Sequence, residues 1–154
     1  MPRRMQSLIG WTLCLALLLC PASSIASTEG QAKASRDRLQ DFIQRYIELS
    51  NARDFQGLRS LYVEQPYVVQ KGEVVEGDFD QQLAENIQAW ERHEVRFAVT
   101  EIQDIARQGS EIVMDFLIEG SGSVWFVPVT RSFEKRLILV QTEAGWKIRE
   151  DITR

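Results

Sequence analysis

Apolar residues recur at two different spacings along this chain, and the change from one to the other divides it into two parts. Between residues 35 and 93 they recur every three or four positions, as they do on one face of an α-helix. After residue 94 apolar and polar residues alternate over long stretches, as they do in half-buried β-strands. Helices followed by strands predict an α+β fold.

Three helices are predicted from the first spacing. The first runs from Ser35 to about Asn51, the second follows Asp54, and the third follows Asp78 and ends near His93. Serine and aspartate favour helix starts because their side chains accept hydrogen bonds from free backbone amides. We expect the third helix to turn one apolar stripe toward the core, made of Phe79, Leu83, Ile87 and Trp90.

The remaining segments are predicted to be strands. A short hairpin is expected around Lys71 and Gly72, and longer strands are expected from Val95 onward. Residues 120–123 predict a turn, and residues 124–141 predict one long strand or a strand with a bulge. Strands of this length must curl around the helices, so we expect three N-terminal helices packed in a curled antiparallel β-sheet. In the last strand we expect a single face to carry Trp146, Ile148, Glu150 and Ile152.

The first 26 residues have the three-part pattern of a secretory signal peptide. Arg3 and Arg4 precede an apolar run at residues 8–20, Pro21 ends it, and small residues reach Ala26. The run is shorter than the roughly 20 residues that span a bilayer as a helix. We therefore expect cleavage after residue 26, a flexible leader at 27–34 and one domain at 35–154, in the periplasm or secreted. An uncleaved membrane anchor is the alternative.

Removal of residues 1–26 changes the chemistry available to the protein. Both cysteines, Cys14 and Cys20, are lost, so no disulfide or thiolate site remains. Two of the 18 basic residues and none of the 22 acidic ones lie in this segment, which leaves a net charge of −6. Nucleic acids and anionic membranes bind concentrated basic faces, so we expect neither nucleic acid nor membrane as a partner.

Motifs for cofactors and metals are missing from the sequence. His93 is the only histidine, and there is no calcium loop, glycine-rich phosphate loop or Gly-x-Ser-x-Gly elbow. We therefore expect no cofactor and no metal.

Two segments resemble known families. Arg45 and Tyr46, followed by residues 51–54 with the sequence Asn-Ala-Arg-Asp, are similar to the first two helices of ketosteroid isomerases. The ending at residues 145–148, with Asp151 after it, resembles the last strand of SnoaL-like cyclases. Both belong to the cone-shaped nuclear-transport-factor-2-like (NTF2-like) superfamily, and the order of elements fits that fold over the whole mature chain.

The resemblance implies catalytic positions, which are only partly filled. Tyr46 stands where the isomerases place a donor to the enolate oxygen. Gln70 stands where they place the aspartate base, and an amide cannot take up a proton near neutral pH. Glu73 is the nearest substitute. The second oxyanion donor of the family falls near residues 134–136, where Glu134 is the one residue that fits. Isomerase chemistry is therefore not expected.

Asp115 lies within a strand that is apolar on both faces. A buried carboxylate needs a partner or a proton, so Asp115 either faces the mouth of a cavity or has a partner such as Arg131 or Arg136. We favour a position on a solvated face or in an ion pair over one in a ligand cavity. A ligand pocket, if the cone has one, is expected to be lined by Tyr46, Tyr62, Trp90, Asp115 and Trp125.

These observations favour an exported, non-catalytic protein that binds a small hydrophobic or amphipathic molecule or a partner segment. One alternative is a cyclase- or isomerase-like enzyme that uses Tyr46 with Asp115, Glu73 or Glu134. Another is an assembly module that forms a homodimer through its sheet face. The apolar residues expected on such a face are Val124, Phe126, Val127 and Val129.

Overall fold

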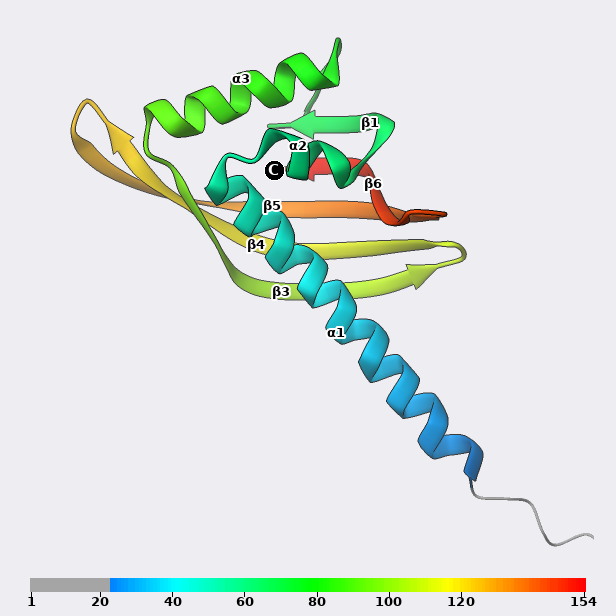
Figure 1. Cartoon of the computed structure of the whole chain (residues 1–154). Coiled ribbons are helices and arrows are strands. Elements are labelled where there is room, and N and C mark those ends of the chain that lie inside the picture. Colours follow the sequence, from blue (N-terminus) through cyan, green and yellow to red (C-terminus); the bar gives the residue numbers. More distant parts are fainter. Residues whose placement is uncertain (1–22) are drawn as a thin grey trace, which may run out of the picture. The chain divides into compact units, whose positions relative to one another are not determined.

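The computed structural model describes residues 23–154 of the chain, and residues 36–154 form one compact unit (Figure 1). The expected signal peptide lies mostly outside the described residues. The three helices are α1 (Ser23–Ala52), α2 (Phe55–Ser60) and α3 (Phe79–Arg92). The six strands are β1 (Tyr62–Gln70), β2 (Glu73–Val74), β3 (Arg96–Gln108), β4 (Glu111–Val124), β5 (Val127–Thr142) and β6 (Gly145–Thr153).

Helix α1 begins at Ser23, twelve residues before the start predicted at Ser35. Residues 27–34, expected to be a flexible leader, therefore have helical backbone in this structure. They include alanine, glutamate, glutamine and lysine, which favour helices, and no proline interrupts them. No helix within residues 23–154 has the length and apolar character needed to cross a membrane. The division into signal peptide, leader and domain stays a prediction.

The strands form one curled, unclosed sheet in the order β2-β1-β6-β5-β4-β3 (Figure 1). All neighbouring strands are antiparallel except β1 and β6, which run parallel. The concave face packs against the helices and carries fully buried side chains, among them Met114, Phe116, Leu137, Leu139 and Ile148. The predicted α+β architecture is confirmed.

The segment that carries the family resemblance joins the helices to the sheet. The Asn51 side chain pairs with the backbone of Phe97 in β3, donating to its carbonyl and accepting from its amide, each at 2.8 Å. Arg53 donates to backbone carbonyls of Ser50, Trp90 and Val95. Asp54 caps α2 by accepting from the amide of Gly57. The motif at 51–54 therefore has a structural role.

The turn predicted at residues 120–123 is wrong, because these residues belong to β4 and the chain reverses at Trp125 and Phe126 instead. Gly120 and Gly122 are strand residues that allow close packing. A Cβ on Gly122 would lie 2.7 Å from the backbone oxygen of His93, and one on Gly120 would meet the Phe97 ring at 3.3 Å. Small residues here indicate close neighbours and not a turn.

Candidate functional site

Four polar side chains from four different elements meet on the concave side of the sheet. Tyr46 comes from α1, Tyr62 from the start of β1, Lys135 from β5 and Asp151 from β6. The Lys135 Nζ lies 2.6 Å from Asp151 Oδ1, and the Tyr62 hydroxyl donates to Asp151 Oδ2 at 2.6 Å. Lys135 Nζ also donates to Thr153 Oγ1 at 3.1 Å and lies 5.4 Å from the centre of the Tyr46 ring.

These four residues, which we call the buried quartet, are removed from solvent. Tyr46, Tyr62 and Asp151 are 5–7% exposed, and the Lys135 side chain is 11% exposed. Charges in such a place are tolerated only when they are paired and hydrogen-bonded. Here both oxygens of Asp151 are engaged, and every buried polar side-chain atom within residues 23–154 has a hydrogen-bond partner.

The pKa shifts in the quartet keep Lys135 and the two tyrosines protonated at neutral pH. Burial raises the pKa of Tyr46 and of Tyr62 and outweighs the Lys135 charge, which lowers the pKa of Tyr46. The neighbouring Asp151 charge raises both pKa values further. Burial lowers the pKa of Lys135, but the Asp151 charge and its hydrogen bonds raise it by more, so the net value lies above that of an ordinary lysine. Lys135 is therefore a cation and both tyrosines are neutral near pH 7.

A small cavity of about 40 Å³ opens directly onto the quartet. A water molecule needs roughly 10–15 Å³ of such space, so the cavity has room for only a few small groups. Drug-sized ligands occupy sites of roughly 300–1,000 Å³. The lining residues are Tyr46, Leu58, Tyr62, Val68, Gln70, Phe79, Gln82, Leu83, Asn86, Trp90, Lys135 and Asp151.

Three of the five predicted pocket residues, Tyr46, Tyr62 and Trp90, do line this cavity, and so does Gln70. Lys135 and Asp151 were missed. The position of Lys135 in β5 was a usable signal. Side chains alternate between the two faces of a strand, and Lys135 lies two and four residues before the inward-facing Leu137 and Leu139.

Asp151 gave no such signal. The predicted common face of Trp146, Ile148, Glu150 and Ile152 is wrong beyond Ile148. Ile148 pairs with Leu139 and Glu150 with Ile138, so Arg149 is an extra residue in β6. This bulge reverses the alternation and turns Asp151 inward with Ile148.

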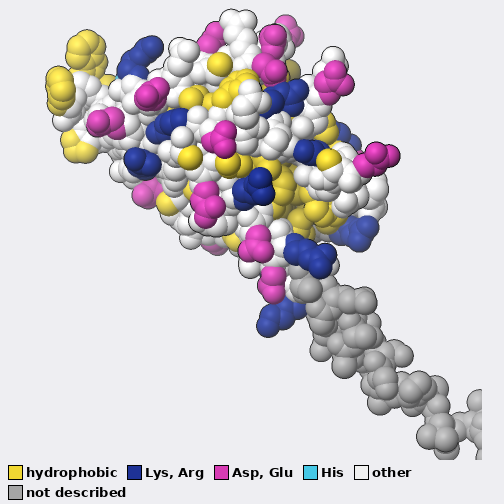
Figure 2. Space-filling model, in the orientation of Figure 1, with side chains coloured by type: hydrophobic (Ala, Val, Ile, Leu, Met, Phe, Trp, Pro, Cys, Tyr) yellow, Lys and Arg dark blue, Asp and Glu magenta, His cyan; other side chains and the backbone are white. Residues whose placement is uncertain are grey.

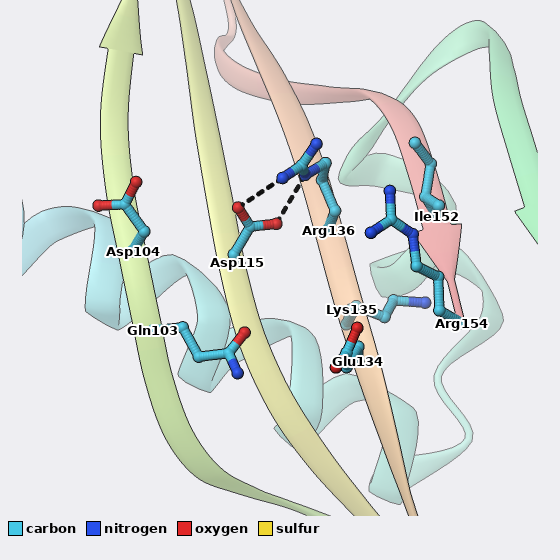
Figure 3. A pocket seen from close by; sticks show the side chains of 8 residues that line it. All are labelled: Gln103, Asp104, Asp115, Glu134, Lys135, Arg136, Ile152 and Arg154. Atoms are coloured by element: carbon cyan, nitrogen blue, oxygen red, sulfur yellow. Dashed lines mark hydrogen bonds and ion pairs between the residues drawn. The ribbon is translucent and has the colours of Figure 1, made fainter.

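Asp115 lies on the opposite, convex face of the sheet (Figure 3). Its carboxylate accepts two hydrogen bonds from Arg136, at 2.7 and 2.9 Å, which confirms the predicted ion pair. The pair lies in an open groove of about 190 Å³. Asp115 is therefore separated from Tyr46 by the sheet, and its placement in the same pocket is wrong.

Three other candidates are also outside the cavity. Glu134 lines the convex groove, because Lys135 beside it faces inward and side chains alternate along a strand. It cannot act with Tyr46. Trp125 is 90% exposed at the end of the β4–β5 hairpin. Glu73 is exposed in β2.

Among residues 23–154, no three His, Cys, Asp or Glu side chains gather in an arrangement that could hold a metal ion. Within the cavity, the groups that a ligand would meet are hydroxyls, amides, one ammonium and one carboxylate already bound by two donors. This set can bind a hydrogen-bonding group, but it offers no unpaired carboxylate as a base.

Comparison with solved structures identifies the fold. An NTF2-like protein with a cystatin-like fold from Novosphingobium aromaticivorans superposes with a TM-score of 0.67 at 17% identity, covering 86% of this chain and 90% of the other. An NTF2-like superfamily protein from Salmonella enterica serovar Typhimurium gives 0.67 at 14% identity, covering 80% and 92%. A ketosteroid isomerase-like protein from Erwinia carotovora gives 0.58 at 16% identity, covering 74% and 90%.

No protein-family model and no curated protein matches the chain. At these identities the structural likeness shows the fold alone. The protein has the cone-shaped NTF2-like fold, as the sequence resemblance implied.

Proposed function

We propose that this NTF2-like-fold protein is a non-catalytic binding protein, and that its cavity takes the polar head of a small, neutral amphipathic molecule. The observation that carries the proposal is the position of Tyr46 and Lys135 on the cavity wall, where both present hydrogen-bond donors. Trp90, Leu83 and Phe79 line the same cavity and offer apolar surface to the carbon atoms next to the head group.

The charge balance of the quartet favours a neutral head group. Lys135 and Asp151 neutralise each other at 2.6 Å, and the two tyrosines are uncharged. A carboxylate ligand would add an unbalanced buried charge, which is costly. A carbonyl oxygen adds no charge and accepts a hydrogen bond from Tyr46.

Catalysis is the second candidate, because Tyr46 and the position of the family base, Gln70, line one cavity. The chemistry disfavours it. Gln70 has no usable pKa, and Asp151 already accepts bonds from Lys135 and Tyr62. A cavity of about 40 Å³ is also far too small for a steroid.

The probe we choose is 2-octanone, with octanoate as the charged counterpart, followed by NMR of the protein. We expect 2-octanone to shift resonances of the cavity residues and to bind at least tenfold more tightly than octanoate. Tyr46→Phe removes one hydrogen bond to the ligand, worth about 0.5–1.5 kcal/mol, and should weaken binding up to about tenfold. Tyr67→Phe, at a residue 48% exposed on β1, is the matched control and should change nothing.

The same sample in D₂O tests catalysis, because enolisation of the ketone exchanges the hydrogens next to its carbonyl for deuterium. We expect exchange at the rate of buffer alone. Binding that is insensitive to Tyr46→Phe would contradict the proposed site, whereas exchange accelerated by the wild type and abolished by Tyr46→Phe would replace binding with catalysis. Gln70→Asp shows whether a base placed in this cavity is sufficient for exchange.

We also propose that the protein is exported and works in the periplasm or outside the cell. The support is the basic, apolar and small-residue succession up to Ala26. Mass spectrometry of the protein from its native cells should find an N-terminus at Ser27 in the exported fraction. An intact Met1 in a soluble cytoplasmic fraction would contradict export.

A further inference from the structure

The end of the β4–β5 hairpin carries four consecutive exposed apolar residues, which we call the apolar tip. Val124 is 43% exposed, Trp125 90%, Phe126 100% and Val127 60%. Figure 2 shows these side chains as a yellow group at one extremity of the 36–154 unit, away from the main body. Large apolar side chains grouped in this way on a surface mark sites of contact with a partner or a membrane.

The turn itself is unusual for these residues. Trp125 has a φ of 51° and Phe126 a φ of 65°, and both are in the left-handed region. Two-residue hairpin turns of this kind favour Asn-Gly, because bulky residues are disfavoured at positive φ. At 90% and 100% exposure, the two rings gain almost no packing within the fold. Packing within the fold therefore does not explain why aromatic residues occupy this turn, whereas contact with a binding partner does.

The size and shape of the tip indicate what it contacts. A tryptophan or phenylalanine buries roughly 150–250 Å². Two such rings and two partly exposed valines fall short of the roughly 800 Å² that each partner buries in a stable protein interface. A bilayer needs no complementary pocket. Tryptophan is enriched at the membrane–water boundary, and phenylalanine and tryptophan anchor proteins that lie on the membrane surface.

The charges at the base of the hairpin indicate the kind of lipid. Arg131 pairs in register with Gly120, and Arg96 with Ser121, and both arginines are exposed. Glu94 lies two residues before Arg96 in the sequence. Glu119 lies next to Gly120, the residue that pairs with Arg131. Positive and negative charges therefore balance near the tip, which does not favour an anionic surface.

We propose that the apolar tip inserts into the interfacial region of a zwitterionic phospholipid bilayer and holds the protein at the membrane surface. This revises the expectation of no membrane partner. That expectation followed from the negative net charge, which opposes electrostatic attraction to anionic lipids but not the insertion of uncharged rings. The proposal is independent of the ligand cavity.

The test is sedimentation of the protein with phosphatidylcholine vesicles. The wild type should sediment with them, equally well at low and high salt. The double variant Trp125→Asn, Phe126→Gly places the favoured residues in the turn, so its melting temperature should not fall. Its affinity for the vesicles should drop at least tenfold. Tyr67→Asn removes an exposed aromatic ring elsewhere and should leave binding unchanged.

Tryptophan fluorescence locates the contact. With brominated phosphatidylcholine, the wild type should be quenched, whereas Trp125→Phe should still bind and lose most of the quenching. Failure of the wild type to sediment would overturn the proposal. So would equal binding by the double variant, since another part of the chain would then be responsible. A wild type that is dimeric without vesicles, with a monomeric double variant, would assign the tip to a second copy of the chain instead.

Discussion

Lys135→Met is expected to lower the free energy of unfolding by about 3–5 kcal/mol, because it leaves the Asp151 carboxylate buried without its countercharge. The two atoms are 2.6 Å apart, and both side chains are largely removed from solvent. Methionine is similar in length to lysine, so the expected loss comes mainly from the charge and not from a cavity. Urea denaturation monitored by circular dichroism measures it.

Two further variants separate this charge effect from a general effect of mutation. Adding Asp151→Asn to Lys135→Met removes the stranded charge but keeps an oxygen to accept from Tyr62, and should restore more than half of the loss. Arg136→Met is the matched control on the same strand, since it breaks the half-exposed pair with Asp115 on the convex face. It should cost no more than about 1 kcal/mol. Equal losses at positions 135 and 136 would contradict a buried quartet.

The quartet also predicts the direction of the pH dependence at alkaline pH. The folded-state pKa values of Lys135, Tyr46 and Tyr62 all lie above their ordinary values of 10.5 and 10.0. The folded protein therefore binds more protons than the unfolded chain above about pH 10, and its stability falls as the pH rises through that range. Below pH 10 this contribution is fully present. The decline from about pH 10 to 11 should be shallower in Lys135→Met.

Trp90→Ala is expected to cost about 3 kcal/mol or more, as truncations of a packed tryptophan do. Its ring meets Phe97 edge-on at 5.0 Å between centroids, and the Arg53 guanidinium lies 6.0 Å from its centroid. Trp90 also lines the ligand cavity, so its removal should enlarge that cavity. We expect the midpoint of urea denaturation to fall while the variant accepts longer ketones than 2-octanone.

Trp125→Ala is the matched control, because it removes the same side chain from a site that is 90% exposed. It should change the free energy of unfolding by no more than about 0.5 kcal/mol. A loss at position 90 below about 1 kcal/mol would mean that α3 does not turn this face toward the core.

The sequence by itself determined the fold class and most of the element order. Helical spacing placed α3 correctly, with Asp78 as its N-cap and Leu83 and Ile87 buried. Strand alternation after residue 94 indicated the long strands, and in one of them, β4, Met114 and Phe116 are fully buried. These features follow from local periodicity, because the spacing of apolar residues within one helix or strand shows which of its sides is buried.

The arrangement of the buried quartet depends on contacts between strands, which the residue pattern within a single strand does not show. A bulge at Arg149 reverses the parity of β6, and only then does Asp151 face Lys135 and Tyr62. The pairing of Asp115 with Arg136 and the outward position of Glu134 likewise depend on how β4, β5 and β6 align. The sequence identified Tyr46 through its resemblance to the isomerase motif and included Tyr62 among the expected pocket residues. The tertiary structure alone decided which charges join them, because register between strands is fixed by packing across the whole sheet.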